Sequence, residues 1–192
     1  MLLAAFLNFQ DAQAVVVGGG AVAERRIGTL LHAGLRVTVI APAISPAVRV
    51  QDVTVIERAY LETDLEGARL VLACTDDPAT NDRITVDALN RGLLVGHAGN
   101  AARGNLRFPA VIERGSVQVA VNTGRELPML AQALTERLES ALPDSLPLDA
   151  WMDRRSAALG LSGTERETAL NRLRADIRHH FLLETDVQER SA

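Results

Sequence analysis

The sequence predicts an α/β protein that begins with a Rossmann-like domain, a parallel β-sheet in which helices connect successive strands. The first observation is an apolar run at 14–17 that stops at three consecutive glycines, 18–20. The second is that short apolar runs alternate with helix-like segments as far as residue 99. The third is that these runs are apolar almost throughout, as strands are when helices cover both faces of a parallel sheet.

The first strand is followed by a helix and a second strand. Residues 21–33 carry apolar residues at helical spacing, and Gly34 comes directly after them, where helices commonly end. Residues 36–42 form an apolar run that a proline closes. Strand, glycine turn, helix and strand make a βαβ unit, whose crossover is right-handed in nearly all proteins.

The same alternation continues along the chain. The expected elements are a strand at 53–59, a turn with short-helix character at 60–68, a strand at 68–77, a helix at 78–92 and a strand at 93–99. Pro78 stands at the start of the expected helix, and Gly92 lies just beyond its last turn. Five strands with interleaved connections in so short a stretch form a compact Rossmann-like domain.

After residue 99 the pattern changes to a small α+β region. Residues 100–115 are predicted to be a loop that leads into a strand, and residues 116–124 a second strand that pairs with the first. Residues 126–142 have the apolar spacing of an amphipathic helix. One hairpin and one helix bury little surface by themselves, so a second copy of the chain is the expected partner.

The C-terminal part is predicted to be a helical domain. Residues 148–187 have a helical pattern with a break at 159–164. At this break, Thr164 and Glu167 have the spacing of a capping box, in which two side chains satisfy the first N–H groups of a helix. The sequence therefore predicts that the second of two C-terminal helices begins just after Thr164.

The composition excludes several kinds of chemistry. All 20 basic residues are arginine, so the chain offers no Schiff-base lysine and no Walker-type phosphate loop. The formal net charge of −4 argues against a nucleic-acid-binding surface. Cys74 is the one cysteine, which excludes an intramolecular disulfide, and the acids that follow it are expected to raise its thiol pKa. No apolar run approaches the ~20 residues that span a bilayer, so we expect a cytoplasmic protein without a membrane segment.

The glycine turn has the GxGxxA pattern of dinucleotide-binding proteins. Glycine is needed there because the turn is tight and the backbone approaches a pyrophosphate, while the following helix supplies N–H groups and a positive dipole end. The candidate cofactor-binding residues in this turn are Gly18, Gly20, Ala21 and Val22. The alternative is a strand-to-helix turn that holds no ligand.

Two further segments are candidates for binding the same cofactor. The second strand ends without the Asp or Glu that commonly binds the ribose, so backbone groups near Pro42 and Ala43 are expected to hold it. Thr75 and Asp76 follow the fourth strand, at the edge of the sheet that faces the ligand, and are expected to contact the adenosine half. The alternative for this segment is that Asp76 or Asp77 caps the next helix.

Basic residues are concentrated in the middle of this acidic chain. Residues 88–125 contain a single acid, Glu113, and five arginines: Arg91, Arg103, Arg107, Arg114 and Arg125. Arginine binds carboxylates in a bidentate manner, so this concentration predicts a site for a ligand with several carboxylates. The alternatives are a solvated face and salt bridges across a dimer interface.

Several segments together resemble one known family. They are FLNF at 6–9, VVVGGGAVAERRIGTLLHAGLRVTVIAP at 15–42, LVLACTDDPATN at 70–81, LRFPAVIERGSVQVAVNTG at 106–124 and LESALP at 138–143. Their order and spacing are similar to those of the siroheme-synthase N-terminal region, also called the precorrin-2 dehydrogenase family. Some members of this family are also sirohydrochlorin ferrochelatases.

The resemblance implies an NAD-binding Rossmann domain at 1–113, a dimerisation hairpin and helix at 114–145 and a C-terminal helical domain at 146–192. It also implies a homodimer that uses NAD to dehydrogenate precorrin-2 to sirohydrochlorin in siroheme biosynthesis. Precorrin-2 is a tetrapyrrole that carries many carboxylates, which would account for the arginines. Arg103, Arg107 and Arg125 are therefore the candidate substrate-binding residues.

The sequence departs from this family after the fifth strand, where the family has a catalytic and metal-handling aspartate. Counting back from Pro109 without a gap puts Gly99 at that position, and a slip of one residue puts Asn100 there. His97 lies two residues from Gly99 and is a candidate base or metal contact, because imidazole exchanges protons near neutral pH. The alternative for His97 is a local hydrogen bond at the end of a strand. The catalytic candidates are His97 and Asn100, and no residue is assigned to a metal.

Two functions of other classes stay open. One is a non-catalytic member of the family that binds NAD or a tetrapyrrole, which the missing aspartate favours. The other is a regulatory nucleotide-binding module of the kind found on potassium-transport proteins, which has a similar glycine turn. Such modules usually keep an acid after the second strand, and this chain has none there.

Overall fold

The structure, a computed structural model, describes residues 2–124 and 127–181. The chain divides into two compact units, Met1–Phe108 and Pro109–Ala192. This division lies a few residues before the boundary between 113 and 114 that is expected from the sequence. The strand at Ala110–Arg114 belongs to the second unit because it pairs with the next strand to form a hairpin. The division expected between 145 and 146 stays a prediction.

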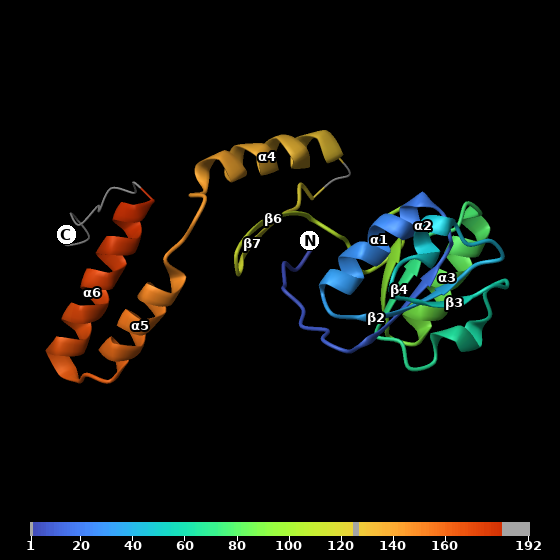
Figure 1. Ribbon diagram of the computed structural model, residues 1–192. Helices are drawn as coiled ribbons and strands as arrows, with labels where there is room; N and C mark the ends of the chain where they lie inside the picture. Colours follow the sequence, from blue (N-terminus) through green and yellow to red (C-terminus); the bar gives the residue numbers. More distant parts are fainter. Residues whose placement is uncertain (1, 125–126, 182–192) are drawn as a thin grey trace. The chain divides into compact units, whose positions relative to one another are not determined.

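The first unit contains a five-stranded parallel sheet (Figure 1). Its strands are β1 (Gln13–Val17), β2 (Arg36–Ile40), β3 (Thr54–Ile56), β4 (Leu70–Ala73) and β5 (Leu94–His97). The strand order is β3-β2-β1-β4-β5, so the order reverses between β1 and β4. In open α/β sheets, ligands bind outside the carboxyl ends of the strands at such a reversal.

Helices cover both faces of this sheet. The connections are α1 (Ala21–His32), α2 (Pro46–Arg49), the 3₁₀ turn η1 (Glu62–Leu65) and α3 (Pro78–Asn90). Ile27 of α1 and Val48 of α2 are buried against one face, whereas Leu65 of η1 and Ile84 of α3 are buried against the other. The predicted Rossmann-like sheet is confirmed, and each of its expected strands and helices is present in the expected order.

The second unit is a hairpin followed by helices. It contains β6 (Ala110–Arg114), β7 (Val117–Val121), α4 (Pro128–Ala141), α5 (Leu148–Leu159) and α6 (Gly163–His180). The antiparallel pair β6 and β7 contacts α4, and α5 packs against α6. The expected capping box was wrong: α6 begins at Gly163 after Ser162, so Thr164 already lies in the first helical turn. Among residues 2–124 and 127–181, no helix has both the length and the apolar character needed to cross a membrane.

Candidate functional site

The turn after β1 packs tightly against two neighbouring loops. Gly18 has a φ of 129°, and a Cβ added to it would lie 2.3 Å from the carbonyl oxygen of Cys74. A Cβ added to Gly19 would lie 2.2 Å from the carbonyl oxygen of Ala43. Only glycine accommodates these contacts, so both positions are glycine for reasons of the fold itself.

The next residue, Gly20, stands instead in open space. It is the N-cap residue of α1, and a Cβ added to it would meet nothing within 4 Å. No side chain of the described residues caps this helix, whereas the carboxylate of Asp77 caps α3 by accepting from the N–H groups of Ala79 and Thr80. The N-cap position of α1 therefore has open space beside it, and the helix begins after β1, where the strand order reverses. That arrangement fits the pyrophosphate of a dinucleotide.

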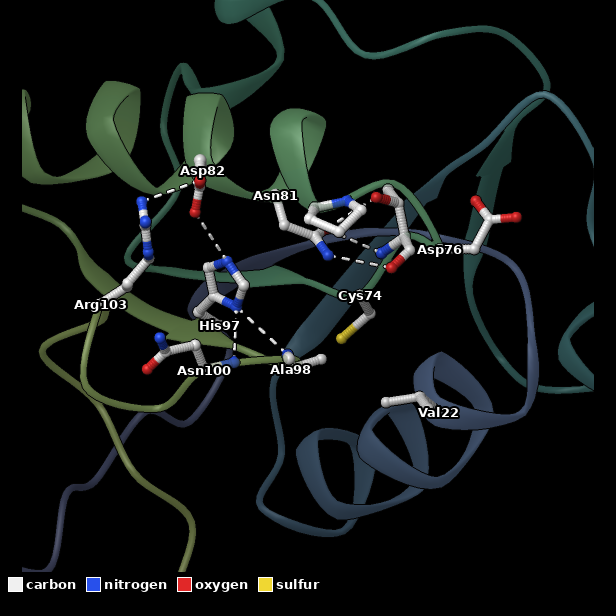
Figure 2. A pocket seen from close by; sticks show the side chains of 12 residues that line it. Val22, Cys74, Asp76, Asn81, Asp82, His97, Ala98, Asn100 and Arg103 are labelled. Carbon is white, nitrogen blue, oxygen red and sulfur yellow. Dashed lines mark hydrogen bonds and ion pairs between the residues drawn. The ribbon is translucent and has the colours of Figure 1, made fainter. Parts of the chain in front are cut away.

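A cavity of about 430 Å³ opens beside this turn, over the carboxyl ends of β4 and β5 (Figure 2). It is lined by Val22, Cys74, Thr75, Asp76, Pro78, Asn81, Asp82, His97, Ala98, Gly99, Asn100 and Arg103. These residues come from the start of α1, the loop between β4 and α3, the first turns of α3, and the end of β5 with the loop that follows it. The cavity thus lies at the edge of the sheet where a ligand was expected.

His97 is the last residue of β5, and both nitrogens of its ring form hydrogen bonds. Its Nδ1 lies 3.2 Å from the N–H nitrogen of Gly99 and 3.0 Å from that of Asn100. Because a backbone N–H only donates, Nδ1 accepts and the ring proton resides on Nε2. Nε2 in turn lies 3.2 Å from Oδ1 of Asp82, to which it donates. The side chain of His97 is 4% exposed, so the ring is a buried link between a loop and a carboxylate.

Asp82 projects from α3 into the cavity. Its second oxygen, Oδ2, lies 2.8 Å from Nη1 of Arg103, so the carboxylate accepts from both an imidazole and a guanidinium. Figure 2 shows the carboxylate of Asp82 between the side chains of His97 and Arg103. The side chain of Asp82 is 35% exposed and that of Arg103 is 55% exposed, so both are accessible from the cavity side.

Asn81, beside Asp82, fixes the loop between β4 and α3. Its Oδ1 accepts from the N–H of Thr75 at 2.9 Å and from the hydroxyl of Thr75 at 2.8 Å. Its Nδ2 donates to the carbonyl oxygen of Thr75 at 2.9 Å. Asn81 is 4% exposed, so these bonds form out of contact with solvent. They hold Thr75 and the adjoining Asp76 at the rim of the cavity.

Cys74 lines the cavity and is a weak nucleophile. Burial is the main cause that raises the pKa of its thiol to about 11, and the charges of Arg26 and Arg25 oppose this only in part. The direction predicted from the sequence is therefore confirmed, but the predicted cause was wrong. Desolvation, rather than neighbouring acids, keeps the thiol protonated.

The structure brings most of the predicted site residues together. Val22, Thr75, Asp76, His97, Asn100 and Arg103 line the same cavity, and the turn formed by Gly18, Gly20 and Ala21 adjoins it. Ala43 contacts Gly19 through its carbonyl oxygen, and Pro42 precedes it in the same loop. Of the two predicted capping residues, Asp77 caps α3, which leaves Asp76 exposed at the rim of the cavity.

The arginines between 88 and 125 that the structure describes differ in their surroundings. Arg91 pairs with Glu62 at the opposite end of α3 from the cavity, and Arg114 pairs with Glu139 in the second unit. Salt bridges within the chain thus account for both residues. Arg103 alone of the three predicted substrate-binding arginines lines this cavity. Arg107 is half-buried elsewhere in the first unit, and Arg125 lies outside the described residues.

Sequence reasoning missed Asn81 and Asp82, which belong to the first turns of α3. A signal was present: two polar residues follow Pro78 and Thr80 in a helix that begins at the ligand-facing edge of the sheet. In the described part of the chain, no group of three or more His, Cys, Asp or Glu residues is placed to hold a metal ion. The residues present offer a dinucleotide site and a paired carboxylate.

Comparisons with known proteins agree with this geometry. Residues 5–110 match the model of a family described as putative NAD(P)-binding. The chain is 39% identical to siroheme synthase from Methylococcus capsulatus over 142 residues, which are 72% of this chain and 30% of that protein. It is 34% identical to siroheme synthase from Azotobacter vinelandii over 157 residues, 80% of this chain and 34% of that protein.

The chain thus spans about a third of the length of these curated relatives. A solved structure titled SirC, precorrin-2 dehydrogenase, matches with a TM-score of 0.77 and 25% identity, covering 96% of this chain and 94% of that one. The expected resemblance to siroheme synthases and precorrin-2 dehydrogenases is confirmed, and so is the order of an α/β domain and a helical C-terminal region.

Proposed function

The chain belongs to the putative NAD(P)-binding family, and from that membership we propose that it is an NAD-dependent dehydrogenase that converts precorrin-2 to sirohydrochlorin. One observation carries the proposal: the open glycine turn adjoins a cavity that contains a carboxylate paired with an arginine and a histidine. The likeness to siroheme synthases and to a precorrin-2 dehydrogenase supports the choice of substrate.

The residues of the site have separate tasks in this reaction. The turn at Gly18–Gly20 and the first N–H groups of α1 would hold the pyrophosphate of NAD⁺. When bound, NAD⁺ supplies the acceptor for the hydride that the substrate loses. Arg103 is exposed enough to contact a carboxylate of the tetrapyrrole while it pairs with Asp82. The half-buried, protonated thiol of Cys74 adds an uncharged group to the wall of the cavity.

Metal insertion is not part of the proposed function, because no three His, Cys, Asp or Glu residues in the described part of the chain are placed to hold a metal ion. The second candidate function is a non-catalytic member that binds NAD⁺ or a tetrapyrrole. The absence of an acid between His97 and Pro109 favours this alternative.

The direct test is an anaerobic assay with enzymatically prepared precorrin-2 and NAD⁺. We expect the absorbance of sirohydrochlorin and of NADH to increase together, one NADH per sirohydrochlorin, because each oxidation removes one hydride. The same assay with NADP⁺ measures the preference between the two cofactors. That preference is open because β2 is not followed by the Asp or Glu that commonly selects NAD. If the protein binds NAD⁺ in calorimetry but forms no sirohydrochlorin, the dehydrogenase proposal is wrong and the non-catalytic alternative stands.

We also propose that the protein acts in the cytoplasm as a homodimer, and that α4 forms the contact. No residue of α4 is buried, and Met129, Leu130, Leu134 and Leu138 are 41% to 73% exposed. Leu130, Leu134 and Leu138 repeat every four residues and so share one face of the helix. An apolar stripe of this kind is typical of an interface between subunits.

Replacing Leu134 with glutamate is expected to convert the dimer to a monomer, because a charge would lie within the apolar contact. Sedimentation velocity at several protein concentrations measures the change. Gln132→Glu is the matched control, since it adds the same charge on the same helix outside the apolar stripe, and it is expected to leave the dimer intact. A wild-type protein that sediments as a monomer at all concentrations would contradict the proposed dimer.

A further inference from the structure

The loop after β5 contains no side chain that can accept a proton at neutral pH. Residues 98–106 include no Asp, Glu, His or Tyr. The side-chain oxygen of Asn100 accepts from the N–H of Ala102 at 3.0 Å, and an amide is not a base. Proton removal from a substrate in this cavity therefore requires a group from another element.

His97 is not placed to be that group. Two backbone N–H groups donate to its Nδ1, and its Nε2 donates to Asp82. A proton could bind to Nδ1 only if the N–H groups of Gly99 and Asn100 both gave up this acceptor. The arrangement instead fixes the direction in which Nε2–H points, which is toward Asp82.

Asp82 has what His97 lacks, a free lone pair on the side of the cavity. Each carboxylate oxygen accepts one hydrogen bond, Oδ1 from His97 and Oδ2 from Arg103, so each keeps further lone-pair capacity. Three other titratable or charged groups line the cavity. They are the thiol of Cys74, the guanidinium of Arg103 and the carboxylate of Asp76, which points away from His97 in Figure 2.

We propose that Asp82 is the residue that accepts the proton when the substrate is oxidised, and that His97 is a positioning residue that orients its carboxylate. This inference rests on the proposed dehydrogenase function. Oxidation of precorrin-2 to sirohydrochlorin removes two hydrogens. One leaves with both electrons of its bond as a hydride, which converts NAD⁺ to NADH. The other leaves as a proton from the tetrapyrrole to Asp82, which passes it to water when the product dissociates.

The first test is Asp82→Asn, which keeps the size of the side chain and removes its basicity. We expect kcat to fall by about 100-fold or more, the range for loss of a general base, while the Kd for NAD⁺ changes little. The pH profiles of kcat for the wild type and for Asp82→Asn are compared, and they should differ because the variant lacks the carboxylate that accepts the proton. Asp87→Asn is the matched control, because Asp87 lies on the same helix and accepts from the hydroxyl of Tyr60 instead.

The second test separates the two contacts of His97. Asparagine places an oxygen where Nδ1 lies and can accept from the loop, but it does not reach Asp82. Glutamine places an N–H near the position of Nε2 and can donate to Asp82. If His97 acts by orienting the carboxylate, His97→Gln retains more of kcat than His97→Asn, even where the thermal stability of both variants is lowered equally.

The outcomes distinguish this inference from the function on which it rests. If the wild type produces no sirohydrochlorin, both the proposed function and the role of Asp82 are wrong. If the wild type turns over and Asp82→Asn turns over equally well with the same pH profile, only the role of Asp82 is wrong. Should Asp82→Asn fail to fold, Asp82→Glu keeps a carboxylate and is expected to keep the pH profile of the wild type at a lower kcat. A different pH profile in Asp82→Glu would overturn the assignment.

Discussion

Gly18→Ala is expected to destabilise the protein by about 3 kcal/mol or more, since it combines a strained backbone conformation with a steric overlap. The φ of 129° at this position is one that residues with a Cβ rarely adopt. The added methyl would also lie 2.3 Å from the carbonyl oxygen of Cys74, which belongs to the backbone and has little room to move. Relief of this overlap would separate the ends of β1 and β4 in the middle of the sheet.

Gly20→Ala is the matched variant two residues along the same turn. Its φ of −98° is allowed for alanine, and its Cβ meets nothing within 4 Å. We therefore expect wild-type stability. The methyl would enter the space assigned to the pyrophosphate, so the affinity for NAD⁺ should fall by at least about tenfold, which is ~1.4 kcal/mol. Urea unfolding measures the first effect and titration calorimetry the second.

The pair separates the structural glycine from the ligand-facing one. Destabilisation by Gly18→Ala alone and weaker binding by Gly20→Ala alone would support the assignment of this turn as a cofactor site. If Gly20→Ala binds NAD⁺ as tightly as the wild type, the cofactor does not approach the turn at Gly20. The glycines would then serve only the packing of the strand-to-helix connection.

The sheet and its helices could be predicted from the sequence because their signals are local. The apolar run that forms β1, the three glycines and the helical spacing after them lie within about 20 consecutive residues. The predicted start of α6 was wrong by a residue or two, because more than one polar residue near Ser162 is of a type that commonly precedes a helix. Which of these residues becomes the N-cap depends on how the helices pack, and a local sequence pattern carries no information about that packing.

The candidate site was predictable only in part, because its contacts join residues distant in the sequence. The edge of the sheet that holds the cavity could be expected from the carboxyl ends of the strands, and the candidates Thr75, His97 and Arg103 line that cavity. The pairing of His97 with Asp82 spans 15 residues and depends on α3 lying beside β5. The concentration of arginines suggested one binding site, whereas Arg91 lies at the end of α3 that is farther from the cavity and pairs with Glu62.

Asn81→Ala is expected to destabilise the protein by about 2–3 kcal/mol, because the N–H, hydroxyl and carbonyl of the half-buried Thr75 lose their partner. The side chain of Asn81 makes three hydrogen bonds to Thr75 while only 4% exposed. Without them the loop between β4 and α3 loses its attachment at the rim of the cavity. Affinity for NAD⁺ should therefore fall as well.

Thr85→Val is the matched control for this prediction. Thr85 is 3% exposed, lies one turn further along α3 and donates its hydroxyl to the carbonyl oxygen of Asn81 at 2.8 Å. Valine keeps the volume and removes one local bond within the helix, so the cost should stay within about 1 kcal/mol. Urea unfolding of both variants gives the comparison. Equal destabilisation by the two would mean that the loop is held by β4 and by the cap at Asp77 rather than by Asn81, and that the rim of the cavity survives its loss.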